Sequence, residues 1–150
     1  MDRSARGGRT SSPLDRSDIS ALAASLGTRR LQRGETAFES HRPSTGVWIV
    51  RSGRPALETD PNGSYHGVLR VLRPGDVDGD IQSLLCTPMA YTARAVEDSV
   101  CLCVAPDRFA RLLRRHPTFT RRWMSSIAER LERSQDRVAG RSSRSSSTWV

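Results

Sequence analysis

The sequence predicts a mainly β domain, a sandwich or barrel, with helices on both sides of it. Short apolar runs recur between residues 29 and 104, separated by glycine and proline at intervals of about 8–12 residues, as is typical of this class. A helical period of apolar residues precedes this region, and another follows it. The length of 150 residues fits one domain with a stable core.

The first segment, residues 1–14, is rich in arginine, serine and glycine, and we expect a disordered basic arm. It lacks the apolar stretch of a secretory signal. Ser17 then offers an N-cap, and Gly27 offers a stop. Between them, apolar residues recur at helical spacing and predict one short amphipathic helix: Ile19, Leu22, Ala23 and Leu26.

The β region should hold six to eight strands. Its apolar runs are residues 36–38, 47–50, 56–58, 68–72, 91–96 and 100–104. Asn62-Gly63 is a good signal for a tight turn between two runs. Pro55 at a strand position indicates an irregular or edge hairpin. Residues 81–85 are too few for a helix of their own and predict one helical turn.

Two helices are expected after the strands, over residues 107–115 and from 118 to about 138. Along the second, alternating steps of four and three residues connect a set that we call the seam residues: Thr120, Met124, Ile127, Leu131, Ser134 and Val138. This periodicity fits a dimer contact, and it fits equally a helix lying on the barrel through Phe119 and Trp123. Residues 140–150 are serine and arginine rich, and we expect a disordered tail.

Composition excludes several classes of protein. No apolar run approaches the roughly 20 residues of a membrane span. An odd number of cysteines without a secretory signal favours a reduced, cytoplasmic protein. The three histidines lack the spacing of a metal helix, no nucleophile motif is present, and we expect neither an enzyme nor a metal site. Cys101 and Cys103 are best interpreted as small buried hydrophobic residues.

The net charge of +8 falls entirely within residues 108–144, which hold 11 arginines and three acidic residues. Two interpretations of this positive charge stay open: a solvated helix face with a loose tail, and a surface that binds nucleic acid. Residues 73–85 carry a different signal. A glycine turn, a carboxylate and a short helical turn follow one another, so backbone N–H groups form a small anion nest beside an acceptor for sugar hydroxyls.

Six segments occur in a characteristic order: 33–38, 47–54, 72–80, 92–98, 107–117 and 122–138. Together they resemble the cyclic-nucleotide-binding domain of the Crp-Fnr family of bacterial transcription regulators, over residues 15 to 139. The resemblance implies a double-stranded β-helix, or jelly-roll barrel, over residues 15–116 and a parallel dimerisation helix over 117–139. It also implies an effector pocket built from Gly79, Asp80 and Ile81, from Met89, Ala90 and Tyr91, and from Ser134 and Gln135.

Two departures from the family pattern bear on function. Where members that bind cyclic AMP have arginine and a small hydroxyl residue, this chain has Met89 and Ala90. A phosphate without that cation loses about 1.5–3 kcal/mol, or roughly ten- to a hundredfold in affinity. We expect Asp80 to be able to hold a ribose hydroxyl still, and we do not expect Arg94 to replace the missing cation. The pocket is therefore interpreted as degenerate, without tight binding of cyclic AMP in the usual mode.

The second departure is at the C-terminus, where no apolar periodicity follows Gly140 to build a winged helix-turn-helix. We therefore expect an effector-sensing and dimerisation domain truncated before its DNA-binding part. Its partner would be itself or a full-length relative, with no sequence-specific DNA contact by this chain alone. Two alternatives stay open. One is a ligand-free module that forms mixed dimers with full-length relatives. The other is a basic protein that binds nucleic acid without sequence preference.

Overall fold

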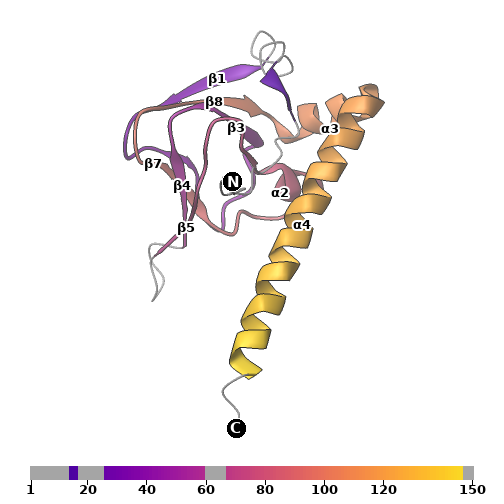
Figure 1. The fold of residues 1–150 in the computed structure, drawn as a ribbon. Helices are drawn as coiled ribbons and strands as arrows, with labels where there is room; N and C mark the ends of the chain where they lie inside the picture. Colours follow the sequence, from indigo (N-terminus) through magenta and orange to yellow (C-terminus); the bar gives the residue numbers. More distant parts are fainter. Residues whose placement is uncertain (1–13, 17–25, 60–66, 147–150) are drawn as a thin grey trace, which may run out of the picture.

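The computed structural model describes residues 14–16, 26–59 and 67–146; for residues 137, 138 and 140–146 it describes the backbone alone. Two antiparallel sheets enclose a common interior, and a long helix runs along the outside of the domain (Figure 1). The expected helix after Ser17 and the expected turn at Asn62-Gly63 lie outside the described residues. Of the expected basic arm only Leu14 is described, and it is buried, so the ordered domain includes the last residue of that arm.

Each sheet has four strands. The first sheet has the order β1-β8-β3-β6, formed by Gly27–Leu31, Ser99–Val104, Val47–Ser52 and Val77–Asp78. The second has the order β2-β7-β4-β5, formed by Thr36–Phe38, Thr92–Ala95, Pro55–Glu58 and Val68–Val71. Most neighbours are distant in sequence, because the chain passes back and forth between the sheets. The expected fold class, a jelly-roll barrel with flanking helices, is confirmed.

All six predicted apolar runs form strands, whereas β1 and β6 were not predicted. Four of the five β1 residues are exposed and carry no apolar signal, and β6 has only two residues. The prediction of an edge hairpin at Pro55 is wrong, because β4 lies between β7 and β5. Pro55 is the first residue of β4, where a missing N–H is tolerated. An irregularity is present two residues further along, as a register shift between Leu57 and Glu58 in the pairing of β4 with β5.

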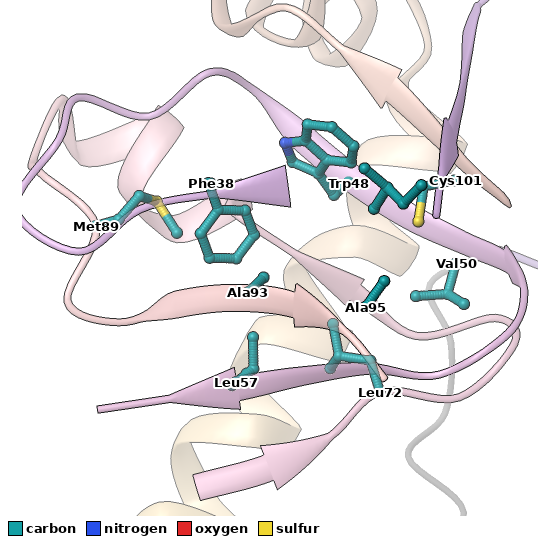
Figure 2. Packing of buried hydrophobic residues seen from close by; sticks show 10 residues of the cluster. Phe38, Trp48, Val50, Leu57, Leu72, Met89, Ala93, Ala95 and Cys101 are labelled. Carbon is teal, nitrogen blue, oxygen red and sulfur yellow. The ribbon is translucent and has the colours of Figure 1, made fainter. Parts of the chain in front are cut away.

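The interior of the barrel is filled by side chains from both sheets (Figure 2). We call this set the barrel core: Leu31, Phe38, Trp48, Val50, Leu57, Leu72, Met89, Ala93, Ala95 and Cys101. Because side chains alternate along a strand, the other residues of β3 and β8 point out of the barrel. Burial of Cys101 agrees with its interpretation as a small hydrophobic residue, while Cys103 is half-buried against the same core.

The outward-facing residues of β3 and β8 form a second core with two helices, α3 (Pro106–Arg115) and α4 (Pro117–Ser146). This outer core contains Leu14, Val47, Ile49, Val77, Leu102, Val104, Phe109 and Trp123. The ring centroids of Phe109 and Phe119 lie 4.9 and 5.2 Å from that of Trp123. Both faces of the first sheet are thus covered, and α4 is fixed to the barrel through its N-terminal turns.

Helix α4 continues to Ser146, seven residues beyond the end predicted for the dimerisation helix. The prediction of a tail without regular structure from residue 140 therefore differs from the structure over residues 140–146. Extending an existing helix costs little, since each added residue also adds a hydrogen bond. The serine- and arginine-rich composition of these residues does not show that they directly follow a helix which they can extend.

Candidate functional site

The centre of the candidate site is the β6–α2 segment, residues 77–85, in which helix α2 (Asp80–Leu85) directly follows β6. Gly79 links the two in the left-handed region, with φ of +80°. A Cβ at this position would lie 2.3 Å from the carbonyl oxygen of Gly46, so only glycine fits. The Gly79 carbonyl accepts hydrogen bonds from the backbone N–H and the hydroxyl of Ser83, at 3.0 and 2.6 Å.

This glycine separates two buried carboxylates that have different partners. Asp80, 1% exposed, accepts a hydrogen bond of 2.8 Å from Trp123 Nε1. Arg130 binds the same carboxylate through both terminal nitrogens, with Nη1 at 3.1 Å from Oδ1 and Nη2 on Oδ2. Both Asp80 oxygens therefore contact α4, and the site that we expected for a ribose hydroxyl is engaged by the protein itself.

Asp78 contacts the barrel side instead. It is 6% exposed and lies opposite Trp48 in the β3–β6 ladder. Its carboxylate accepts hydrogen bonds from the Gly79 N–H at 2.7 Å and from the Tyr91 hydroxyl at 3.0 and 3.2 Å. Burial raises the pKa of Asp78 to about 6, although these hydrogen bonds act in the opposite direction. Burial and the nearby Asp78 charge raise the pKa of Tyr91 as well.

The other predicted pocket residues are divided between the interior and the surface. Met89 is buried in the barrel core, and Tyr91 packs partly against that core. Ile81 is half-buried, whereas Ala90 is exposed. On α4, Ser134 and Gln135 are both exposed. The structure thus brings Gly79 and Tyr91 together around Asp78, and it does not bring Ala90, Ser134 or Gln135 into contact with them by any described hydrogen bond.

Arg94, which we did not expect to supply a cation to the pocket, is engaged elsewhere. Its Nε lies 3.3 Å from Glu58 Oε2, and its Nη1 donates to the Gly34 carbonyl at 2.9 Å. A surface cavity of about 310 Å³ lies beside α2. None of the eight predicted pocket residues lines it; its walls are Pro43, Ser44, Gln82, Ser83, Cys86, Thr87, Pro88 and Pro106.

The seam residues of α4 differ in their exposure to solvent. Ile127 is half-buried against the outer core, and the Thr120 hydroxyl donates to the Leu113 and His116 carbonyls. Met124 and Leu131, seven residues apart, are 60% and 59% exposed. The periodicity therefore combines intramolecular packing with an exposed apolar stripe. The side chain of Val138 lies outside the described residues.

Three residues that bear on the site were not predicted, namely Asp78, Trp123 as a hydrogen-bond donor, and Arg130. A signal for two of them was present, because Trp123 and Arg130 are seven residues apart and so share one helix face. The sequence carried no clear signal for Asp78, because its strand β6 has only two residues and no detectable periodicity.

Within the described ranges, no three histidine, cysteine or acidic residues lie close enough to hold a metal ion. In the same part of the chain, no helix combines the length and hydropathy that a membrane span requires.

Comparison with known proteins identifies the domain. The model of the cyclic nucleotide-binding domain family matches residues 28–116. The chain belongs to this family. The predicted resemblance to the Crp-Fnr type of domain is thereby confirmed, and the family and fold are those of regulatory domains rather than of an enzyme.

The HTH-type transcriptional regulator Cmr of Mycobacterium tuberculosis is 44% identical over 135 residues, which cover 90% of this chain and 54% of that protein. The chain thus spans about half the length of this relative.

Two solved structures show the same fold. The catabolite activator protein of Thermus thermophilus aligns with a TM-score of 0.75 and 22% identity, covering 86% of this chain and 61% of that one. The c-di-GMP responsive global regulator CLP of Xanthomonas campestris aligns with a TM-score of 0.72 and 17% identity, covering 87% and 64%.

Proposed function

We propose that this chain is the effector-sensing and dimerisation part of a cytoplasmic transcription regulator. In this proposal the β6–α2 segment senses the effector and α4 forms the dimer. The observation that carries it is the contact between Asp80, at the first position of α2, and Trp123 and Arg130 of α4. A ligand that moved α2 would have to change these contacts, so occupancy of the barrel and position of the helix would be coupled.

The pocket is proposed to be degenerate towards cyclic AMP. Met89 stands where the family pattern has a cation, and its side chain contributes to the barrel core. Arg130 is paired with Asp80 and Arg94 with Glu58, so neither guanidinium is available for a phosphate without breaking an ion pair. CLP, with the same fold, is by its name responsive to c-di-GMP, which supports the idea that this fold serves more than one effector.

The partner is proposed to be a second copy of the chain. Met124 and Leu131 expose apolar side chains on one side of α4, at the heptad spacing of a parallel helix pair. The adjoining side of the same turns, which carries Trp123 and Ile127, is covered by the outer core. An exposed stripe on a helix whose other side is already packed is the surface left for a partner.

Light scattering on the purified chain tests the dimer. We expect the mass of two chains for the wild type and of one chain for Leu131→Arg, because a charge in the centre of an apolar helix pair loses its hydration. Ser125→Arg is the matched control, since Ser125 is exposed and lies about 100° around the helix from Met124. A monomeric wild type, or equal dissociation by both substitutions, would contradict the proposal. A chain that dimerises only when mixed with a full-length relative would replace the homodimer with the mixed dimer.

A further inference from the structure

We propose that Asp78, held by Tyr91, is a specificity residue that excludes a phosphate anion from the barrel. The effector would then meet this carboxylate with a hydrogen-bond donor or a cation. This inference rests on the proposed function, since it concerns the ligand of the same pocket. Asp78 would then oppose the binding of cyclic nucleotides in addition to Met89. A ligand that carries a hydrogen-bond donor or a positive charge would fit instead.

The Asp78 carboxylate is positioned on the barrel side of the first sheet. Asp78 lies on β6 opposite Trp48, whose ring belongs to the barrel core. Its partner Tyr91 packs against the same core, with the ring centroids of Phe38 and Tyr91 6.1 Å apart. Asp78 therefore contacts the barrel interior and not the outer core that holds Asp80.

Tyr91, the partner of Asp78, is also close in the chain to Met89. The two residues are two positions apart and both pack on the barrel core. Figure 2 shows Met89 with its thioether close to Phe38, in the interior that Trp48 also lines. A cation at position 89 would thus share its surroundings with the Asp78–Tyr91 pair.

The hydrogen-bond partners of Asp78 carry no charge. The hydrogen bonds that Asp78 accepts from described residues come from two neutral donors, the Gly79 N–H and the Tyr91 hydroxyl. The nearest basic groups are paired with other acids: Arg70 with Asp76 at 3.3 Å, and Arg130 with Asp80. Arg70 offsets the charge of Asp78 only in part, because burial is the larger effect and raises the pKa of this carboxyl. A phosphate beside the ionised carboxylate is repelled in a medium that screens poorly.

This arrangement predicts that restoring the missing cation will not restore binding. In a Met89→Arg variant the new guanidinium would pair with Asp78, and the net charge near both groups would be about zero. Only removal of the carboxylate would leave that guanidinium free for a phosphate. The two positions are therefore expected to be strongly non-additive.

The experiment is a thermal-shift titration with cyclic AMP on four proteins: wild type, Met89→Arg, Asp78→Asn/Met89→Arg, and the control Asp107→Asn/Met89→Arg. Asp107 is an exposed acid on α3, so the control makes the same change of charge outside the barrel. We expect the double variant with Asp78→Asn to respond at a concentration roughly ten- to a hundredfold lower than Met89→Arg and the control. The wild type should not respond at micromolar ligand.

Melting without ligand shows whether each variant folds. Met89→Arg should melt below the wild type, because a buried ion pair with Asp78 replaces apolar packing in the barrel core. The double variant should melt lower still and be rescued by cyclic AMP. If Met89→Arg does not fold, Met89→Lys replaces it in each protein. Equal response of the single and double variants, no response of the double variant, or an equal gain in the control would overturn the proposal. Any of these results with an intact dimer would leave the proposed function standing, whereas a monomeric wild type would remove the proposed function instead.

Discussion

Asp78 and Asp80 are separated by one glycine and are both nearly inaccessible to solvent, yet they belong to opposite sides of the first sheet. Asp80 contacts the helix side, where an arginine and an indole N–H satisfy its charge. Asp78 contacts the barrel side, where a tyrosine hydroxyl and a backbone N–H are its described partners. The two aspartates thus differ in their electrostatic surroundings, because Asp80 has a positively charged partner and the described partners of Asp78 are neutral.

The difference has a consequence for stability. In a buried ion pair, the attraction between the two charges offsets much of the free energy lost when they leave water. A buried carboxylate with neutral partners lacks this attraction, so part of that loss remains. The pKa of Asp78 rises to about 6 mainly because of burial, with the negative charge of Asp80 adding to the effect. We infer that the helix side of the β6–α2 segment is built for stability and the barrel side retains a polar group at a cost.

The largest effect is expected from removing the cation on the helix side. Arg130→Met leaves the Asp80 carboxylate buried without its ionic partner, which should cost about 3–5 kcal/mol in the free energy of unfolding. Urea unfolding at neutral pH measures it. Arg133→Met is the control, because Arg133 makes a long pair of 3.9 Å with Glu129 at the surface and should change stability by less than about 1 kcal/mol.

A double variant shows whether the loss in Arg130→Met comes from the stranded charge. Asp80→Asn in the Arg130→Met background removes that charge and should recover a large part of the stability. If Arg130→Met and Arg133→Met were equally mild, the helix side would hold no important ion pair, and the contrast with Asp78 would disappear.

The next effect concerns the glycine that sends the two carboxylates to opposite sides. Gly79→Ala adds a Cβ that would lie 2.3 Å from the Gly46 carbonyl oxygen, in addition to the strain of a positive φ. Strain of about 1–2 kcal/mol and overpacking of about 1–3 kcal/mol give an expected loss of roughly 2–5 kcal/mol.

Gly34→Ala is the matched control for this substitution. Gly34 also has a positive φ, of +91°, but nothing lies within 4 Å of its added Cβ. Only the strain should remain, so its loss of stability should be smaller. Equal losses in urea unfolding would mean that the contact with Gly46 does not fix the β6–α2 turn.

The position of the segment in the fold could be predicted from sequence, but the directions of its side chains could not. Glycine, a carboxylate and a short helical turn between strands are local signals, and they correctly indicated a turn followed by α2. Which acid faces which side depends on β6, a strand of two residues with no periodicity to detect. We therefore assigned Asp80 to the pocket and overlooked Asp78.

The partners of both acids lie far away in sequence, which is the second limit of the prediction. Trp123 and Arg130 follow Asp80 by 43 and 50 residues, and Tyr91 follows Asp78 by 13. Helical spacing gave Trp123 as a contact of the barrel in one of two equally supported interpretations, the other being a dimer contact of the same helix. It carried no information on the acceptor for its N–H, which depends on the docking of α4 in three dimensions.

The smallest effect is expected on the barrel side, where it should depend on pH. The folded-state pKa of Asp78, about 6, is above its ordinary value of 3.8, so the folded state binds the proton more tightly than the unfolded chain. Its contribution is therefore favourable below about pH 4 and is lost as the pH rises through 6. Asp78→Asn removes this dependence. Relative to the wild type, the variant should gain roughly 1–3 kcal/mol between pH 4 and pH 8.

Urea unfolding of both proteins at several pH values measures this gain, because the difference between them isolates the contribution of Asp78. Asp107→Asn provides the baseline for an exposed acid and should show no such trend. A wild type whose stability relative to Asp78→Asn rises with pH would mean that the ionised carboxylate is stabilised in the barrel. In that case a cation must reach Asp78 in solution. Both carboxylates would then have a positively charged partner, and they would differ only in the side of the sheet on which they lie.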